Sequence, residues 1–121
     1  MNKVILCGNL GRDPESRTID NGNKVTNFSI ATNESYKDKA GEWQEQVQWH
    51  NIVTWGKLAD YTATLNKGDS VLIEGKIRTR TFQDKEGNNR IEFKVVANNV
   101  QLVSRSQPKQ PQQSNNDDLP W

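Results

Sequence analysis

The segment Glu45–Asp69, EQVQWHNIVTWGKLADYTATLNKGD, decides the fold of this 121-residue chain. Its first part, from Glu45 to Trp55, is rich in β-branched and aromatic residues and predicts a strand. From Gly56 to Leu65 the apolar residues follow a helical spacing, which predicts one helix of about two to three turns. Gly68 then ends the helical stretch. A strand, a single short helix and a turn are therefore expected in direct succession.

Strand signals dominate the sequence on both sides of this segment. Two runs, Lys3–Leu10 and Lys24–Thr32, precede it, and two more, Ser70–Phe82 and Asn89–Val103, follow it. Three strands, one short helix and two strands are the order of the OB-fold, a five-stranded barrel. An antiparallel sheet with a capping helix is the alternative, but it would leave sheet edges open. We therefore expect an all-β OB-fold barrel with one short helix between strands three and four.

The composition indicates one small domain followed by a tail. Residues 1–103 hold the strand signals, whereas residues 104–116 are mostly polar and are expected to form a disordered, flexible linker. The hydrophobic fraction of 32% is low, so oligomerisation is a natural way to complete the core. The net charge is only +1, and any affinity for nucleic acid would have to come from local patterning of charge.

Several classes of protein are disfavoured by what the sequence lacks. Cys7 is the single cysteine, which excludes an internal disulfide and suits a reducing cytosol. The N-terminal apolar run stops at Leu10, too short for a signal peptide or a membrane span. The sequence has no metal-binding motif, Gly-rich phosphate loop or paired carboxylates, so neither a metal nor a cofactor is expected.

An enzyme would have to use Cys7 and His50 as a nucleophilic pair. Cys7 lies inside an apolar run, a setting that raises the pKa of a thiol and makes it inert. No Asp or Asn is obviously placed to orient the ring of His50. We therefore expect no catalytic residues and no enzymatic activity.

Alternation along the third and fourth strands predicts an interface for single-stranded nucleic acid. Side chains of one parity share a face of a strand. The third strand therefore places Trp49 and Trp55 together, and the fourth places Arg78, Arg80 and Phe82 together. Unpaired bases stack on such aromatic faces while cations bind the phosphates between them. Because stacking tolerates any base, we expect little sequence preference.

The other aromatic residues have different expected roles. Phe28 and Phe93 lie on strongly apolar strand faces and are expected in the core, and Tyr61 on the helix is expected there too. Tyr36 and Trp43 flank a polar hairpin, where a stacking role and a local packing role both stay open. Isolated basic residues are uninformative on their own, because a solvated lysine is the default surface residue.

The sequence ends with an acidic and aromatic tip after the polar linker. Its five residues are Asp117, Asp118, Leu119, Pro120 and Trp121. A tryptophan at this position adds nothing to a core, and clustered negative charge beside an apolar group suits a basic pocket on a partner protein. A frayed polar tail is the alternative. A linker of this length reaches roughly 20 Å, so the tip could also visit the Arg78 and Arg80 surface when no nucleic acid is bound.

Three separated blocks resemble the bacterial-type single-stranded DNA-binding proteins, the SSB family. The blocks are Asn2–Glu15, Trp49–Ala59 and Ile73–Arg80, in the family's order and followed by its acidic, Pro-aromatic ending. The resemblance implies an OB barrel that assembles into a homotetramer and binds and protects single-stranded DNA during replication, recombination and repair. It further implies that residues 117–121 recruit replication and repair proteins.

The resemblance also assigns individual residues. The stacking aromatics of the family fall on Tyr36, Trp49, Trp55 and Phe82, and its assembly contacts fall on Asn2 and His50. The residues by themselves would make His50 a satisfied, half-buried histidine and not an interface residue. The full set expected to bind DNA is Tyr36, Trp49, Trp55, Phe82, Arg78, Arg80, Lys57 and Lys67.

Some features depart from the family pattern. Asn51 occupies a position that is often Arg, the linker is short, and the tip has two acids and Trp121 in place of the usual Phe. Such a compact form suits a phage-encoded protein as well as a cellular one. An OB-fold binder of RNA or tRNA remains the alternative within the same class of binding modules.

Overall fold

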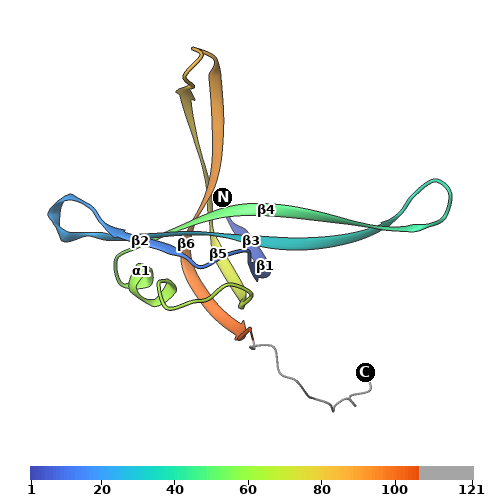
Figure 1. Ribbon diagram of the computed structural model, residues 1–121, viewed down its shortest axis with the longest axis horizontal. Helices are drawn as coiled ribbons and strands as arrows, with labels where there is room; N and C mark the ends of the chain where they lie inside the picture. Colours follow the sequence, from blue (N-terminus) through green and yellow to red (C-terminus); the bar gives the residue numbers. More distant parts are fainter. Residues whose placement is uncertain (107–121) are drawn as a thin grey trace.

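Five strands of this chain pair in a ring, from which two long hairpins project (Figure 1). The computed structural model describes residues 1–106; most of the predicted linker and the whole predicted tip lie outside the described residues. The elements are β1 (Val4–Leu10), β2 (Glu15–Thr18), a 3-10 turn (Asp20–Gly22), β3 (Lys24–Lys37), β4 (Trp43–Trp55), α1 (Gly56–Thr62), β5 (Ser70–Gln83) and β6 (Asn89–Ser104).

The ring runs β1-β5-β6-β4-β3 and closes because β1 also pairs with β3. At that closure Leu10 lies opposite Ile30. The β4–β6 pairing is parallel and joins Ile52 to Val95 and Val53 to Val96, whereas the other pairings are antiparallel. The predicted five-stranded OB-fold barrel, with its helix between the third and fourth barrel strands, is confirmed.

The core fills the inside of this ring. Aliphatic side chains from all five barrel strands are buried there, and Phe28 joins them as predicted. Leu65, which follows the helix, closes one end of the cluster. The remaining members are Leu10, Ile30, Ile52, Val71, Ile73, Val95, Ala97 and Val100.

The elements differ from the predicted ones in three places. The strand β2 was not predicted; all four of its residues are polar and exposed, and it pairs only with the start of β3. Strands β3 and β4 extend into the polar hairpin between them. The helix α1 ends at Thr62 instead of Leu65, and a turn completes the connection.

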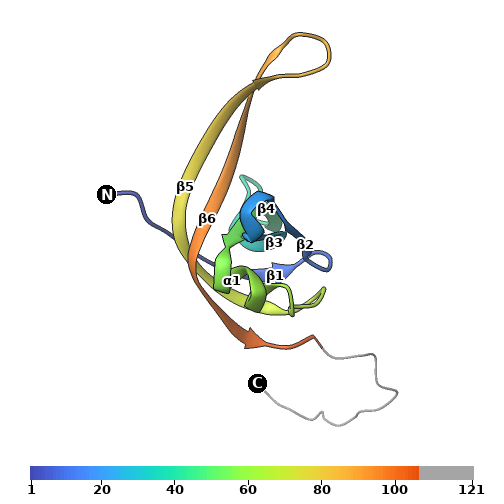
Figure 2. The same cartoon turned by 90° about the vertical axis from the view of Figure 1, so that its left-hand side faces the viewer.

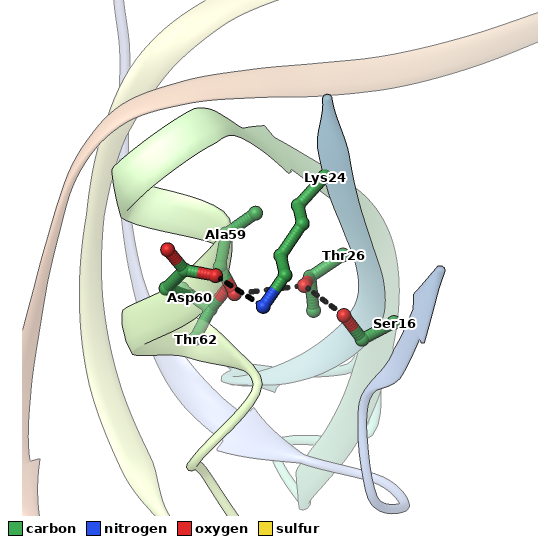
Figure 3. Close-up of polar contacts among 6 residues, drawn as sticks. All are labelled: Ser16, Lys24, Thr26, Ala59, Asp60 and Thr62. Carbon is green, nitrogen blue, oxygen red and sulfur yellow. Dashed lines mark hydrogen bonds and ion pairs between the residues drawn. The ribbon is translucent and has the colours of Figure 1, made fainter. Parts of the chain in front are cut away.

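Hydroxyl groups hold α1 against the barrel (Figure 3). Thr26 Oγ1 of β3 donates to the carbonyl oxygen of Ala59 at 2.8 Å, and the hydroxyl of Thr62 lies 2.8 Å from that of Thr54 on β4. At the surface, Lys24 Nζ pairs with Asp60 Oδ1 at 2.9 Å. Because buried hydroxyls need partners, these bonds let α1 close the barrel without leaving unsatisfied polar groups.

A buried carboxylate ties the end of β6 to the turn before β5. Asp69 Oδ1 accepts the backbone N–H of Ser106 at 2.7 Å, and Oδ2 accepts that of Asn66 at 2.8 Å. Burial alone would raise the pKa of Asp69, but the two N–H donors outweigh it and lower the pKa. The position of Ser106, the last residue described, is therefore fixed at the closed end of the barrel.

Two hairpins extend beyond the barrel. We call them the β3–β4 arm, residues 32–48, and the β5–β6 arm, residues 76–94. In Figure 1 the two arms point in different directions, and Figure 2 shows the β5–β6 arm curving away from the ring. Gly75 marks the base of the second arm, where a side chain would collide with the carbonyl oxygen of Val96.

Three expectations about single side chains were wrong. Phe93 is 62% exposed, because it lies on the β5–β6 arm, where no second sheet covers its face. Tyr61 is 40% exposed, since the buried face of α1 is formed by Ala59 and Thr62 instead. Cys7 is exposed, because the alternation of β1 turns Gly8 and Leu10 inward. Within residues 1–106, no helix is both long and apolar enough to cross a membrane.

Candidate nucleic-acid interface

Two tryptophans are presented on the outside of β4. Trp49 is 59% exposed and Trp55 is 48% exposed. They share one parity, and the six residue steps from one to the other span about 20 Å of strand. The ring of Trp49 lies over Gly11, where any side chain would collide with it. The chain therefore supports this ring from beneath and leaves its upper surface to solvent.

A polar hollow lies between the two tryptophans. Ser29 of β3 is directly opposite Asn51 of β4, and Asn27 is the next residue of the same parity along β3. With Arg12 and Glu15 they line a hollow of about 240 Å³. Its floor offers amide and hydroxyl groups, which suit the polar edges of bases or sugars.

The basic residues of the fourth predicted strand lie on one face of the β5–β6 arm. The register places Lys76, Arg78, Arg80 and Phe82 opposite Val96, Lys94, Glu92 and Arg90. This face turns toward Trp55, which lines a hollow of about 650 Å³ together with Arg78 and Arg80. A second hollow, of about 560 Å³, is lined by Trp49 and Phe82. The structure thus brings five of the predicted residues together around β6.

The charges on this arm are partly neutralised. Arg80 donates from Nη2 and Nε to Glu92 Oε1, at 2.8 Å and 3.0 Å. Hydrogen bonding by Arg80, helped by the charge of Lys94, lowers the pKa of Glu92 against a smaller opposing effect of burial. Arg90 Nε donates to Asp84 at 2.9 Å. Lys76 and Arg78 form no ion pair within residues 1–106.

Tyr36 lies on the other arm. Its side chain is exposed, and its pairing with Gln44 places it farther out along the β3–β4 arm than Trp49. Nearby, Lys37 Nζ is 5.5 Å from the centroid of the exposed Trp43 ring, a cation–π contact. The register puts Lys37 and Trp43 on the same face as Trp49, and Tyr36 on the opposite face of the arm.

The two predicted lysines lie elsewhere. Lys57 is exposed on α1, and Lys67 is exposed in the turn before β5, where its backbone N–H donates to Asp13 Oδ1 at 2.8 Å. Neither lysine lines any of the three hollows described above. Lys57 lies two residues after Trp55 in the sequence, whereas Lys67 lies in a separate turn.

The two predicted assembly residues make contacts within their own chain. The amide of Asn2 donates to the carbonyl oxygen of Ile77 at 2.9 Å and accepts the backbone N–H of Ile77 at 3.0 Å. His50 is half-buried, and its Nε2 lies 2.9 Å from Thr32 Oγ1. No hydrogen bond joins His50 to Cys7 among the described residues. Across the same part of the chain, no three His, Cys, Asp or Glu side chains form a metal-binding group.

Sequence reasoning missed Glu92 and Lys94, which line all three hollows. A usable signal was present, because the turn between β5 and β6 sets Gln83 opposite Asn89. Counting back along the two strands from this pair puts Arg80 opposite Glu92. Hairpin register thus identifies the partner of a charged side chain where strand parity alone gives only its face.

Comparisons with known proteins agree with this geometry. A model of the Single-strand binding protein family matches residues 1–103. The chain is 45% identical over 105 residues to single-stranded DNA-binding protein 1 of Chlorobaculum tepidum, and 45% identical over 104 residues to the single-stranded DNA-binding protein of Neisseria meningitidis. The matches cover 85% of this chain but 65% and 60% of these relatives, so it spans less than two thirds of their length.

Two solved structures share the fold. An SSB of Plasmodium falciparum in complex with ssDNA matches with a TM-score of 0.77 at 28% identity, covering 88% of this chain and 96% of that one. A deletion mutant of the single-stranded DNA binding protein from Thermus aquaticus matches with a TM-score of 0.76 at 23% identity. That second match covers 86% of this chain and 51% of the other, and it supports the fold alone.

Proposed function

The chain belongs to the single-strand binding protein family, and on this premise we propose that it binds single-stranded DNA with little sequence preference. The observation that carries the proposal is the arrangement around β6. Trp49 and Phe82 line one hollow, and Trp55 lines the next with Arg78 and Arg80. Stacking surfaces thereby alternate with cations, the combination that single strands require.

Within this proposal each group has a stated role. Trp49, Trp55 and Phe82 stack bases, and Tyr36 is a further stacking residue on the other face of the β3–β4 arm. Arg78 and Arg80 bind phosphates, and Asn51 offers a neutral amide in the hollow between the tryptophans. Lys57 and Lys67 add positive charge outside the linings of the hollows. The protein acts by binding and has no catalytic role of its own.

The wider biological role is an extension of the same proposal. We place the protein in the bacterial cytoplasm, protecting single strands during DNA replication, recombination and repair. Residues 117–121, outside the described part of the chain, recruit replication and repair proteins. Asn2 and His50 take part in assembly of a homotetramer, for which the exposed apolar side chains of Ile5 and Val103 offer area to bury.

Tryptophan fluorescence during titration tests the central claim. Adding oligo-dT to the full chain should quench the emission strongly, and added salt should reverse the quenching as phosphate contacts are lost. A parallel titration with oligo-U separates a DNA binder from an RNA binder. A duplex of the same length serves as the control, since its bases are not free to stack. Absence of quenching by oligo-dT would remove the proposal.

A further inference from the structure

Arg80 already has a carboxylate partner in this structure. Two of its N–H groups donate to Glu92 Oε1, and Glu92 Oε2 lies 4.0 Å from Lys94 Nζ. One carboxylate thus engages two of the cations on the face of the β5–β6 arm. A carboxylate and a phosphate present similar anionic oxygens to a guanidinium. Glu92 therefore occupies Arg80 in the way that a phosphate would.

The same arrangement covers a stacking surface. The guanidinium carbon of Arg80 lies 5.1 Å from the centroid of the Phe82 ring. Guanidinium groups and bases stack on aromatic rings in a similar manner. Glu92 holds the guanidinium in this position through its hydrogen bonds. Before DNA binds, Glu92 therefore occupies Arg80, and the guanidinium of Arg80 covers one face of the Phe82 ring.

The position of Glu92 is fixed by the fold. It lies directly opposite Arg80 in the β5–β6 register, and its side chain is only 29% exposed. It also lines all three hollows around β6. A negative charge at the centre of a surface that binds a polyanion calls for an explanation beyond ordinary surface charge.

We propose that Glu92 is an internal competitor for the DNA phosphate, an inference that rests on the proposed binding of single-stranded DNA. When DNA binds along the β5–β6 arm, a phosphate replaces Glu92 on Arg80, and a base replaces the guanidinium on Phe82. The released carboxylate stays close to Lys94. Binding at this arm is therefore an exchange of partners, whereas Trp49 and Trp55 have no cation–π contact to break within residues 1–106.

This exchange has two measurable consequences. First, DNA binding breaks the Arg80–Glu92 contact, so the affinity for DNA is lower than it would be if every cation on the arm were free. The released carboxylate also attracts a cation from solution, which offsets part of the counterion release at Arg80. The salt dependence is therefore shallower than for a free arginine, which contributes roughly 0.7 to the log–log slope for single strands.

The test is to neutralise Glu92 while keeping its shape. Glu92→Gln should tighten binding to fluorescein-labelled oligo-dT about 2- to 5-fold at low salt, the range of an exposed ion pair. It should also steepen the salt slope by up to about 0.7. Glu86→Gln is the matched control, because it removes the same charge from the turn of the same arm, and Glu86 forms no ion pair with any residue from 1 to 106. Glu86→Gln should change both the affinity and the salt slope less than Glu92→Gln does.

Two further variants separate competition from simple repulsion. Glu92→Asp keeps the charge but shortens the reach to Arg80. It should therefore tighten binding to oligo-dT, but by less than Glu92→Gln does. In an Arg80→Gln background, the gain from Glu92→Gln should shrink to the size seen for Glu86→Gln. A gain that is equal in the two glutamine variants, or that persists without Arg80, would overturn the inference.

The outcomes also separate this inference from the proposed function. A wild-type protein that binds oligo-dT as tightly as Glu92→Gln does, with the same salt slope, retains the proposed function and loses only the internal competitor. A wild-type protein and variants that all fail to bind would remove the proposed function itself. Circular-dichroism melting curves confirm that each variant is folded before it is titrated.

Discussion

The two arms close with the same turn but carry different chemistry. The turns are Asp38-Lys39-Ala40-Gly41-Glu42 and Asp84-Lys85-Glu86-Gly87-Asn88. In each, one oxygen of the aspartate accepts two backbone N–H groups at 2.9 Å, and the glycine adopts a positive φ. The second oxygen of Asp38 accepts from neutral Gln44, whereas that of Asp84 accepts from Arg90.

The strands beyond these turns continue the difference. The β5–β6 arm holds three ion pairs, and the described residues of the β3–β4 arm hold none. The β3–β4 arm and the adjoining part of β4 instead present exposed aromatic rings, Tyr36, Trp43, Trp49 and Trp55. The number of basic residues on a strand therefore overstates the positive charge that is free to bind, because neighbouring carboxylates already hold part of it.

The largest expected effect is the loss of affinity when a tryptophan is removed, and it tests how much of the binding comes from aromatic stacking. Trp49→Ala and Trp55→Ala should each weaken binding to oligo-dT by about 1 to 3 kcal/mol, since each removes a stacking surface. The loss should be nearly independent of salt, because no charge changes. Fluorescence anisotropy of a labelled oligonucleotide at several salt concentrations measures both properties.

Two variants control this experiment. Tyr61→Ala removes an exposed aromatic ring from α1, away from the hollows, and should leave the affinity unchanged. Trp49→Leu keeps apolar packing over Gly11 but removes the aromatic face, so it should weaken binding almost as much as Trp49→Ala, which separates lost stacking from lost packing. Full affinity in both tryptophan-to-alanine variants would show that the cations alone carry the interface.

A smaller effect is expected on the salt dependence of binding, which should differ between a free arginine and an ion-paired one. Arg78 has no ion-pair partner among the described residues, so Arg78→Gln should lower the log–log salt slope by roughly 0.7. Removing the neutral pair together, in the double variant Arg80→Gln with Glu92→Gln, should lower the slope by less. Salt titrations of the two proteins give the comparison directly, and equal slopes would mean that the pair does not offset counterion release.

The smallest expected effect concerns the two turn aspartates. The side chain of Arg90 is the largest cause that lowers the pKa of Asp84, whereas the backbone N–H of Glu42 is the largest that lowers the pKa of Asp38. Arg90→Gln should therefore raise the pKa of Asp84 and leave that of Asp38 unchanged. NMR titration of the carboxyl carbons measures both values, and parallel shifts would contradict the distinction.

The sign of the pH dependence follows from these lowered pKa values. Each aspartate stabilises its turn when it is ionised, so the stabilisation is complete above its ordinary pKa. It is lost as the pH falls through the lowered pKa of the folded state. At acidic pH both turns should therefore be less stable, and the amide-exchange protection factors of residues 38–42 and 84–88, which correct for the intrinsic pH dependence of exchange, should fall.

Much of the fold could be predicted because apolar alternation reports which surfaces pack. The barrel strands, their order and the helix all follow from it. The strand β2 could not be found this way, since Glu15–Thr18 has no apolar residue and forms by pairing with β3. Phe93 was misplaced for a related reason. Alternation identifies a common face, but only the three-dimensional structure shows that nothing covers that face on the β5–β6 arm.

For the candidate site, the sequence predicted only those features that a single strand determines. Strand parity placed Trp49 with Trp55 and Arg78 with Arg80, because parity is a property of one strand alone. It said nothing of what lies across the strand, so Glu92 was missed although hairpin register pairs it with Arg80. Partners that depend on two strands need the register, and those that depend on the curvature of the barrel need the structure.

The parallel pairing of β4 with β6 bears on how the chain folds. It consists of two paired positions, Ile52 with Val95 and Val53 with Val96, and it joins the two hairpins to each other. Each hairpin connects neighbouring residues and can form within about 1–10 microseconds, whereas this pairing must close a long loop that contains α1. The β4–β6 pairing should therefore form late, after both hairpins.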